Sequence, residues 1–227
     1  MTQARQVCRW HAQPDVEALE RAVVAAILHA AQEALALRGA FRLVLAGGST
    51  PQRIYRALRG ANTDWNRWHI YFGDERCLPP DDGERNSRMA AAAWLDHVTI
   101  PPAQIHPIPA ELGAREAAAA YVEQLVTVGE FDLVLLGLGE DGHTASLFPG
   151  HDWGTAPAAP DALAVFDAPK PPPQRVSLGA RRLGVARQVV FVVSGEGKRP
   201  ALAEWQEGKQ IPAASISPVT GVDIFFS

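Results

Sequence analysis

A histidine stands in a glycine-rich segment of this sequence, where a short loop can hold it for proton transfer. The segment Gly137–His143 contains three glycines and follows a near-continuous apolar run, Phe131–Leu136. His143 lies two residues after Asp141, so a carboxylate is close to the imidazole along the chain. An imidazole that is partly desolvated beside a carboxylate is well placed to act as a general base near neutral pH. We therefore predict a catalytic role for His143, and a hydrogen-bonded structural histidine is the alternative.

A second glycine-rich turn has the features of an anion site. Gly47, Gly48 and Ser49 lie between an apolar run and a segment that begins with Pro51. Glycines let the backbone approach a ligand closely, and the free N–H groups at a helix start favour negative charge. A tight strand-to-helix connection with Ser49 or Thr50 as the N-cap explains the same residues. The pattern by itself leaves phosphate binding and simple capping open.

Charged residues follow two further apolar runs. Asp74, Glu75 and Arg76 follow His69–Phe72 after a single glycine, and Lys198 follows Val189–Val193. At the end of a strand, Arg76 is suited to bidentate capture of a phosphate, and Asp74 to contacts with a hydroxyl group or a base. A solvated surface cluster is the competing interpretation for Asp74, Glu75 and Arg76, and Lys198 has the same ambiguity.

Several other chemistries are disfavoured by the motifs. The run Gly137–Gly142 matches Gly-x-Gly-x-x-Gly, but Pro149–Gly150 cuts short the long helix that a dinucleotide-binding fingerprint opens. The sequence has no P-loop spacing, no Gly-x-Ser-x-Gly turn and no His-Glu-x-x-His pattern among its seven histidines. We therefore expect no nicotinamide site, no serine nucleophile, no metal and no cofactor.

Length and composition limit the class of protein. The chain has 227 residues, a formal charge of −4 and 47% hydrophobic residues, as expected of a globular protein with a sizeable core. Without a basic surplus or an apolar run of about 20 residues, neither nucleic acid nor a membrane is an expected partner. Met1–Gln6 has no apolar stretch typical of a signal peptide, and two cysteines are too few for a disulfide framework. A cytoplasmic location is therefore expected.

The elements that must position these residues alternate along the chain. Helices are predicted over Asp15–Leu37, Pro51–Leu58, Ser87–Leu95 and Ala114–Val126. Strands are predicted over Phe41–Ala46, His69–Phe72, Phe131–Leu136, Val189–Val193 and Val222–Phe226, the last at an edge, with Ala162–Phe166 and Arg175–Leu178 as an antiparallel pair.

This alternation predicts an α/β fold with a Rossmann-like, doubly wound and mostly parallel sheet flanked by helices, as a single domain over residues 1–227. In open α/β sheets, ligands bind outside the carboxyl ends of the strands. The turns at 46–50, 73–76, 137–143 and 193–198 all follow predicted strands. We expect them to converge on one site.

With these motifs in hand, the chain resembles the 6-phosphogluconolactonases of the glucosamine-6-phosphate isomerase/6-phosphogluconolactonase family. The most specific matching segment is Leu135–Gly150. The resemblance extends over most of the chain through Leu45–Pro51, Phe72–Arg76 with Asn86, Pro169–Pro172, Arg175–Leu178, and Gly195 with Lys198. Departures occur at Glu140, Gly179 and Ser227, none of which is a proposed base or phosphate ligand.

The resemblance implies a fold, a reaction and roles for residues. The implied fold is that of the glucosamine-6-phosphate deaminases and ribose-5-phosphate isomerases. The implied reaction is hydrolysis of 6-phospho-D-glucono-1,5-lactone to 6-phospho-D-gluconate in the oxidative branch of the pentose phosphate pathway, without a cofactor. The implied catalytic residues are His143, as the general base, and Asp74, which falls near the sugar. Phosphate binding is implied for Arg76, Lys198 and the Gly47–Ser49 turn. Arg175, from a matching segment, joins the substrate-binding candidates.

Partners and alternatives complete the sequence-based hypothesis. The only partner expected is the small phosphosugar lactone, and the expected assembly is a monomer or a weak homodimer. A glucosamine-6-phosphate deaminase is the first alternative, but in that family the turn continues Gly-His-Ile-Ala-Phe-Asn-Glu-Pro, whereas His143–Pro149 carries no acid. A non-catalytic sugar-phosphate-sensing domain is the second, and it lacks an attached DNA-binding segment here.

Overall fold

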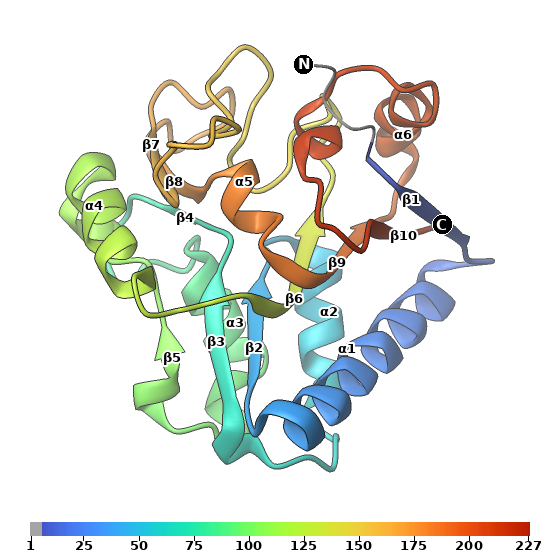
Figure 1. The fold of residues 1–227 in the computed structure, drawn as a ribbon, viewed down its shortest axis with the longest axis vertical. Coiled ribbons are helices and arrows are strands. Elements are labelled where there is room, and N and C mark those ends of the chain that lie inside the picture. Colours follow the sequence, from blue (N-terminus) through green and yellow to red (C-terminus); the bar gives the residue numbers. More distant parts are fainter. Residues whose placement is uncertain (1–5) are drawn as a thin grey trace.

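The computed structural model describes residues 6–227. Of the Met1–Gln6 segment that argued against a signal peptide, only Gln6 lies within the described residues. A seven-stranded, fully parallel sheet of order β1-β10-β9-β6-β2-β3-β5 forms the centre of the molecule (Figure 1). Its strands are β1 (Cys8–Ala12), β2 (Phe41–Leu45), β3 (Trp68–Phe72), β5 (Ile105–His106), β6 (Phe131–Gly137), β9 (Ala186–Val193) and β10 (Val222–Phe226).

The helices cover both faces of this sheet. Phe131 and Asp132 are adjacent on β6, so their side chains point to opposite faces. Arg38 of one helix binds Asp132 at 2.8 Å, whereas the Arg182 guanidinium of another lies 3.9 Å from the centre of the Phe131 ring. The helices are α1 (Val16–Arg38), α2 (Ser49–Leu58), α3 (Asn86–Ala93), α4 (Ala114–Leu125), α5 (Ala180–Leu183) and α6 (Arg199–Gln206). Because α1 and α5 lie on opposite faces, the predicted doubly wound fold is confirmed.

Local signals in the sequence set the ends of α1. The Asp15 carboxylate accepts a hydrogen bond from the Ala18 amide at 2.7 Å and caps the first turn. Gly39 ends the helix at φ 74°, in the left-handed region that glycine adopts without strain. Leu19, Val23 and Ile27 are fully buried, so the predicted apolar stripe faces the sheet.

A second, three-stranded sheet lies beside the main one. Its order is β4 (Asp74–Arg76), β8 (Arg175–Leu178) and β7 (Ala162–Val165), and both pairings are antiparallel. The predicted pairing of the segments that form β7 and β8 is confirmed. The predicted turn at residues 73–76 is wrong, because Asp74–Arg76 forms a strand along β8. A three-residue charged strand carries no hydrophobic alternation, and its partner lies about 100 residues further along the chain.

The main sheet also corrects the prediction for the last strand. Val222–Phe226 was expected at an edge, but β10 lies between β1 and β9 and pairs with both over its whole length. The edge strands are β1 and the two-residue β5, and neither was predicted. Both are short and only partly buried, so neither gives the continuous apolar run that marks a central parallel strand.

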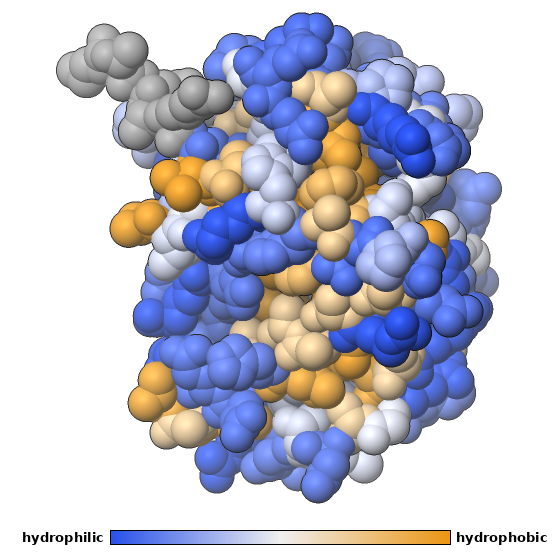
Figure 2. Space-filling model, turned by 90° about the vertical axis from the view of Figure 1, so that its right-hand side faces the viewer, coloured by the Kyte–Doolittle hydropathy of each residue, from blue (hydrophilic) through white to orange (hydrophobic). Residues whose placement is uncertain are grey.

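The surface is mixed in character. Hydrophilic residues cover most of the face drawn in Figure 2, and hydrophobic residues gather along its middle. Within residues 6–227, no helix combines the length and the apolar character needed to span a bilayer.

Candidate active site

A cleft of about 470 Å³ opens at the carboxyl ends of β2, β6 and β9, beside β4 and β8. The turns that follow these strands form its floor and walls, as expected for an open α/β sheet. All eight predicted site residues line this one cleft: Gly47, Gly48, Ser49, Asp74, Arg76, His143, Arg175 and Lys198. The structure therefore brings together residues from five separate segments of the chain.

His143 is held by the carboxylate of Asp141. Its Nδ1 lies 2.5 Å from Asp141 Oδ1, and its backbone N–H donates to the same oxygen at 3.2 Å. Burial raises the pKa of Asp141, but the hydrogen bond and charge of His143 outweigh burial and hold that pKa below its ordinary value. An ionised Asp141 accepts a hydrogen bond from Nδ1–H, and this arrangement leaves Nε2 as the basic nitrogen of the neutral ring.

A missing side chain makes room for this imidazole. A Cβ atom on Gly139 would lie 2.0 Å from His143 Nδ1, so the glycine is required by space rather than by its φ angle. On its other side the ring packs against buried Phe148, with 4.8 Å between the ring centres. The guanidinium of Arg175 lies 5.6 Å from the centre of the same Phe148 ring. Phe148 thus lies near both the histidine and one of the predicted cations.

The first turn of α2 presents backbone N–H groups to the cleft. Gly48 precedes the helix at φ 109°, and no side chain caps the turn. The first amides of a helix have no partner within it and carry partial positive charge. Ser49 is therefore the first residue of the helix rather than its cap, which removes the simple capping interpretation. Thr50 Oγ1 lies 2.7 Å from Ser194 Oγ and joins this turn to the end of β9.

The three predicted cationic side chains of the cleft differ in the protein groups that they contact. Lys198 forms no ion pair within residues 6–227. Arg175 Nε and Nη2 donate only to carbonyl oxygens of residues 170–172, at 2.8–3.2 Å. Burial lowers the pKa of Arg175, and the charge of Asp74 opposes this shift. Arg76 Nη1 donates to the Glu84 carbonyl at 2.9 Å, with the Glu84 carboxylate 3.9 Å away.

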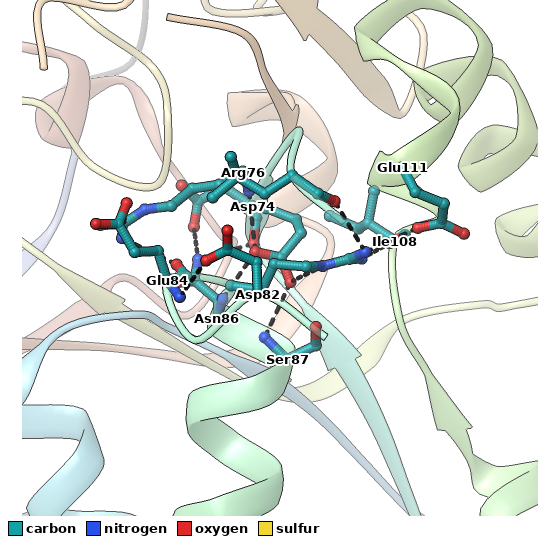
Figure 3. Close-up of polar contacts among 11 residues, drawn as sticks. Asp74, Arg76, Asp82, Glu84, Asn86, Ser87, Ile108 and Glu111 are labelled. Carbon is teal, nitrogen blue, oxygen red and sulfur yellow. Dashed lines mark hydrogen bonds and ion pairs between the residues drawn. The ribbon is translucent and has the colours of Figure 1, made fainter. Parts of the chain in front are cut away.

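Asp74 is buried, and both of its carboxylate oxygens are already engaged. Ser146 Oγ donates to Oδ2 at 2.6 Å. Asn86 Nδ2 donates to Oδ1 at 3.0 Å (Figure 3). Asn86 also lies against the glycine turn, where a Cβ atom on Gly47 would be 2.0 Å from its Oδ1. Asp74 is thus a fixed acceptor in the wall of the cleft, and Asn86 connects it to the predicted anion site.

Sequence reasoning missed several residues of the cleft. Thr50, Ser194 and Lys170 line it, although each was seen only as part of a longer motif. Ser146 supports Asp74 from the segment after His143, and a serine there gave no separate signal. Glu140, one of the departures from the resembled family, lies against the turn before Lys198, where a Cβ on Gly197 would be 2.9 Å from its Oε1.

The donor set of the cleft offers no metal ligands in the usual arrangement. Within residues 6–227, no group of three or more histidine, cysteine, aspartate or glutamate side chains is placed to hold a metal ion. The chemistry open to the cleft is instead proton transfer by His143 beside an anion bound to the cations and the α2 amides.

Fold and cleft together define a doubly wound α/β protein with a cation-lined site and a histidine–carboxylate pair at the strand ends. Residues 14–225 match the family described as glucosamine-6-phosphate isomerases/6-phosphogluconolactonase, and the chain belongs to this family.

Individual relatives agree with this assignment. The chain is 40% identical over 204 residues to a 6-phosphogluconolactonase of Mycobacterium leprae, covering 84% of this chain and 81% of that protein. The crystal structure of a 6-phosphogluconolactonase from Thermotoga maritima superposes with a TM-score of 0.89 at 27% identity, covering 97% of this chain and 99% of that one. A monomeric glucosamine-6-phosphate deaminase, 17% identical with a TM-score of 0.82 and 96% coverage of both chains, shares the fold.

Proposed function

We propose that this chain hydrolyses 6-phospho-D-glucono-1,5-lactone to 6-phospho-D-gluconate, the reaction that the names of its relatives indicate. The observation that carries the proposal is the position of His143. Its Nδ1 is bound to Asp141, and the ring lies in the same cleft as Arg76, Lys198 and the uncapped turn of α2. Hydrolysis of a phosphorylated lactone requires a base and an anion site in one cleft.

The phosphate is the anchor of the substrate in this proposal. Arg76 and Lys198 supply charge-assisted hydrogen bonds, and the amides of Gly48 and Ser49 add the field of the α2 N-terminus. A group held in this way fixes the lactone carbonyl relative to the histidine, which removes much of the entropic cost of reaction. Arg175 is placed to contact the rest of the substrate through the guanidinium edge that does not donate to residues 170–172.

The hydrolysis then proceeds in two steps. His143 Nε2 takes a proton from a water molecule as the water oxygen attacks the lactone carbonyl carbon and forms a tetrahedral oxyanion. As the carbonyl reforms, the bond from that carbon to the ring oxygen breaks, and protonated His143 gives its proton to the ring oxygen. Backbone N–H groups of the glycine turns stabilise the oxyanion, and Asp141 stabilises the imidazolium. Asp74 holds the sugar as a hydrogen-bond acceptor.

The setting of the enzyme is part of the proposal. We propose that residues 1–227 act as one domain, because the site takes residues from Gly47 to Lys198. The low cysteine content supports a cytoplasmic location. A monomer or weak homodimer remains the prediction for assembly, since every residue of the mechanism comes from one chain.

The test is hydrolysis of freshly made 6-phosphoglucono-δ-lactone near neutral pH, measured against its spontaneous hydrolysis. Unphosphorylated gluconolactone is the control for phosphate dependence, and parallel assays with EDTA test the expectation that no metal is needed. Rapid turnover of the phosphorylated lactone alone is the expected result. Rates equal to that of spontaneous hydrolysis in every assay would overturn the proposal. The glucosamine-6-phosphate deaminase and the sugar-phosphate-sensing domain would then be the functions to test.

A further inference from the structure

Glu75 lies between two site residues but does not line the cleft. Its side chain is completely buried, and its carboxylate accepts three backbone N–H groups. Oε1 accepts from the amides of Arg76 at 2.9 Å and Asn86 at 2.7 Å, and Oε2 accepts from the amide of Ser87 at 2.9 Å. One carboxylate therefore joins β4 to the first turn of α3.

A buried ionic network holds this carboxylate in place. Arg85 is 3% exposed, and its Nε lies 3.5 Å from Glu75 Oε2. Arg85 Nη1 donates to Glu111 at 2.8 Å, and Nη2 donates to the Ile108 carbonyl at 2.7 Å (Figure 3). The α3 N-terminus adds its positive end beside Glu75. A buried carboxylate with this set of partners is fixed in position, because any movement would leave several polar groups unpaired.

Glu75 sits at the base of the loop formed by residues 77–85. Its Oε1 binds the amides on both sides of that loop, at Arg76 and Asn86. The Arg76 guanidinium in turn donates to the carbonyl of Glu84, which belongs to the same loop. Both the backbone from which the Arg76 side chain starts and the carbonyl that it contacts are thus set by the closure of this loop.

We propose that Glu75 is the positioning residue for Arg76: by tying residues 76 and 86 together, it places the guanidinium where the phosphate of the substrate binds. This inference rests on the proposed function, in which Arg76 holds that phosphate. Glu75 contacts neither the cleft nor the substrate in this scheme, and Arg85 and Glu111 act one step further away. Removing the Glu75 charge therefore weakens phosphate binding by Arg76 and leaves the position of His143 unchanged.

The test is Glu75→Gln, which keeps the size of the side chain but turns one acceptor oxygen into a donor that cannot accept from the facing amides. We expect kcat/KM for the phosphorylated lactone, corrected for the folded fraction, to fall about tenfold, mainly through KM. The rate with unphosphorylated gluconolactone should change less than twofold. Glu33→Gln, at an exposed glutamate of α1 without an ion pair in residues 6–227, is the matched control and should leave both rates unchanged.

A double-mutant cycle with Arg76→Ala separates positioning from a purely structural role. If Glu75 acts through Arg76, then Glu75→Gln changes kcat/KM less than twofold in a chain that already carries Arg76→Ala. The same tenfold loss in both backgrounds, or equal losses with both lactones, overturns the inference while leaving the proposed function intact. A wild-type chain without turnover refutes the proposed function instead, and the cycle is then measured as affinity for inorganic phosphate.

Glu111→Gln keeps the inference testable if Glu75→Gln does not fold. Glu111 is the outer member of the network, with a side chain that is 36% exposed. We expect the same selective rise in KM for the phosphorylated lactone, about two- to threefold, and again none in the Arg76→Ala background. An unchanged KM, or a rise that persists without Arg76, would count against the positioning role.

Discussion

Two charged regions of this molecule differ in whether their charged side chains have ion-pair partners within the protein. At the β1 side of the sheet, Asp223 accepts hydrogen bonds from Arg9 at 2.7 and 2.8 Å, from His11 at 2.8 Å and from Gln188 at 3.3 Å. At the strand-end cleft, Lys198 has no ion pair within residues 6–227. One region satisfies its charge within the protein, and the other keeps charge available.

This difference indicates a structural role for the Asp223 region and an anion-binding role for the cleft. The partners of Asp223 come from β1 and β9, on either side of its own strand β10, so the carboxylate joins three neighbouring strands and supports the sheet. A cation without a carboxylate partner beside an uncapped helix start adds little to stability but attracts an anion. The experiments below test this comparison, beginning with the largest expected effect.

Removal of the base should have the largest effect on activity. His143→Ala is expected to lower kcat for the phosphorylated lactone about 10²- to 10⁴-fold, the usual contribution of general acid–base catalysis. Binding of 6-phosphogluconate, measured by calorimetry, should remain close to that of the wild type because the cations are untouched. A variant that keeps the wild-type rate would show that the base has been assigned wrongly.

Loss of the unpaired cation should affect binding rather than the chemical step. Lys198→Ala is expected to raise KM roughly 10- to 100-fold, because one charge-assisted hydrogen bond contributes about 1.5–3 kcal/mol. The melting temperature should be unchanged. Steady-state kinetics with the phosphorylated lactone and a thermal unfolding curve check both parts. A large loss of stability would place Lys198 with the Asp223 cluster and contradict the comparison.

The carboxylate that orients the histidine should have a smaller effect on activity. Asp141→Asn is expected to lower kcat about tenfold, since the imidazolium loses one charged hydrogen bond. KM should change little, because Asp141 does not contact the phosphate in this scheme. Steady-state kinetics of Asp141→Asn and His143→Ala, measured side by side, test this prediction. If kcat of Asp141→Asn equals that of the wild type, the 2.5 Å contact between Asp141 and His143 does not contribute to the reaction.

The paired region should show no effect on activity at all. Asp223→Asn is expected to leave kcat and KM unchanged and to lower the free energy of unfolding at neutral pH by about 1.5–3 kcal/mol. Burial raises the pKa of Asp223, but the hydrogen bonds from Arg9, His11 and Gln188 outweigh burial and hold it below its ordinary value.

The sign of the pH dependence follows from this lowered pKa. The Asp223 carboxylate stabilises the fold fully above the unfolded pKa of aspartate, and this contribution is lost as the pH falls through the lower folded pKa. The stability difference between wild type and Asp223→Asn should therefore shrink in acid, as measured by denaturant unfolding at several pH values. A difference that grows in acid would contradict the assignment of Asp223 as an ionised acceptor.

Local signals made much of this molecule predictable. The fold class, the helix that begins after Asp15, and the strands that lead into the glycine turns at Gly47 and Gly137 all follow from apolar periodicity and glycine turns within about 25 residues. The convergence of the site residues also followed, because parallel strands end at the same edge of a sheet. Signals of this range are present in the sequence before any long-range contact forms.

The sequence by itself thus determined the candidates for chemistry that line the cleft: a histidine beside a carboxylate, and cations after buried strands. Tertiary structure alone decided that β10 is internal, that Asp74–Arg76 is a strand, and that Glu75 is a buried acceptor rather than one more surface charge. Each of these depends on pairings between segments about 10 to 200 residues apart. A charged side chain becomes a ligand, an acceptor or a surface group according to what packs around it, and no local pattern specifies those neighbours.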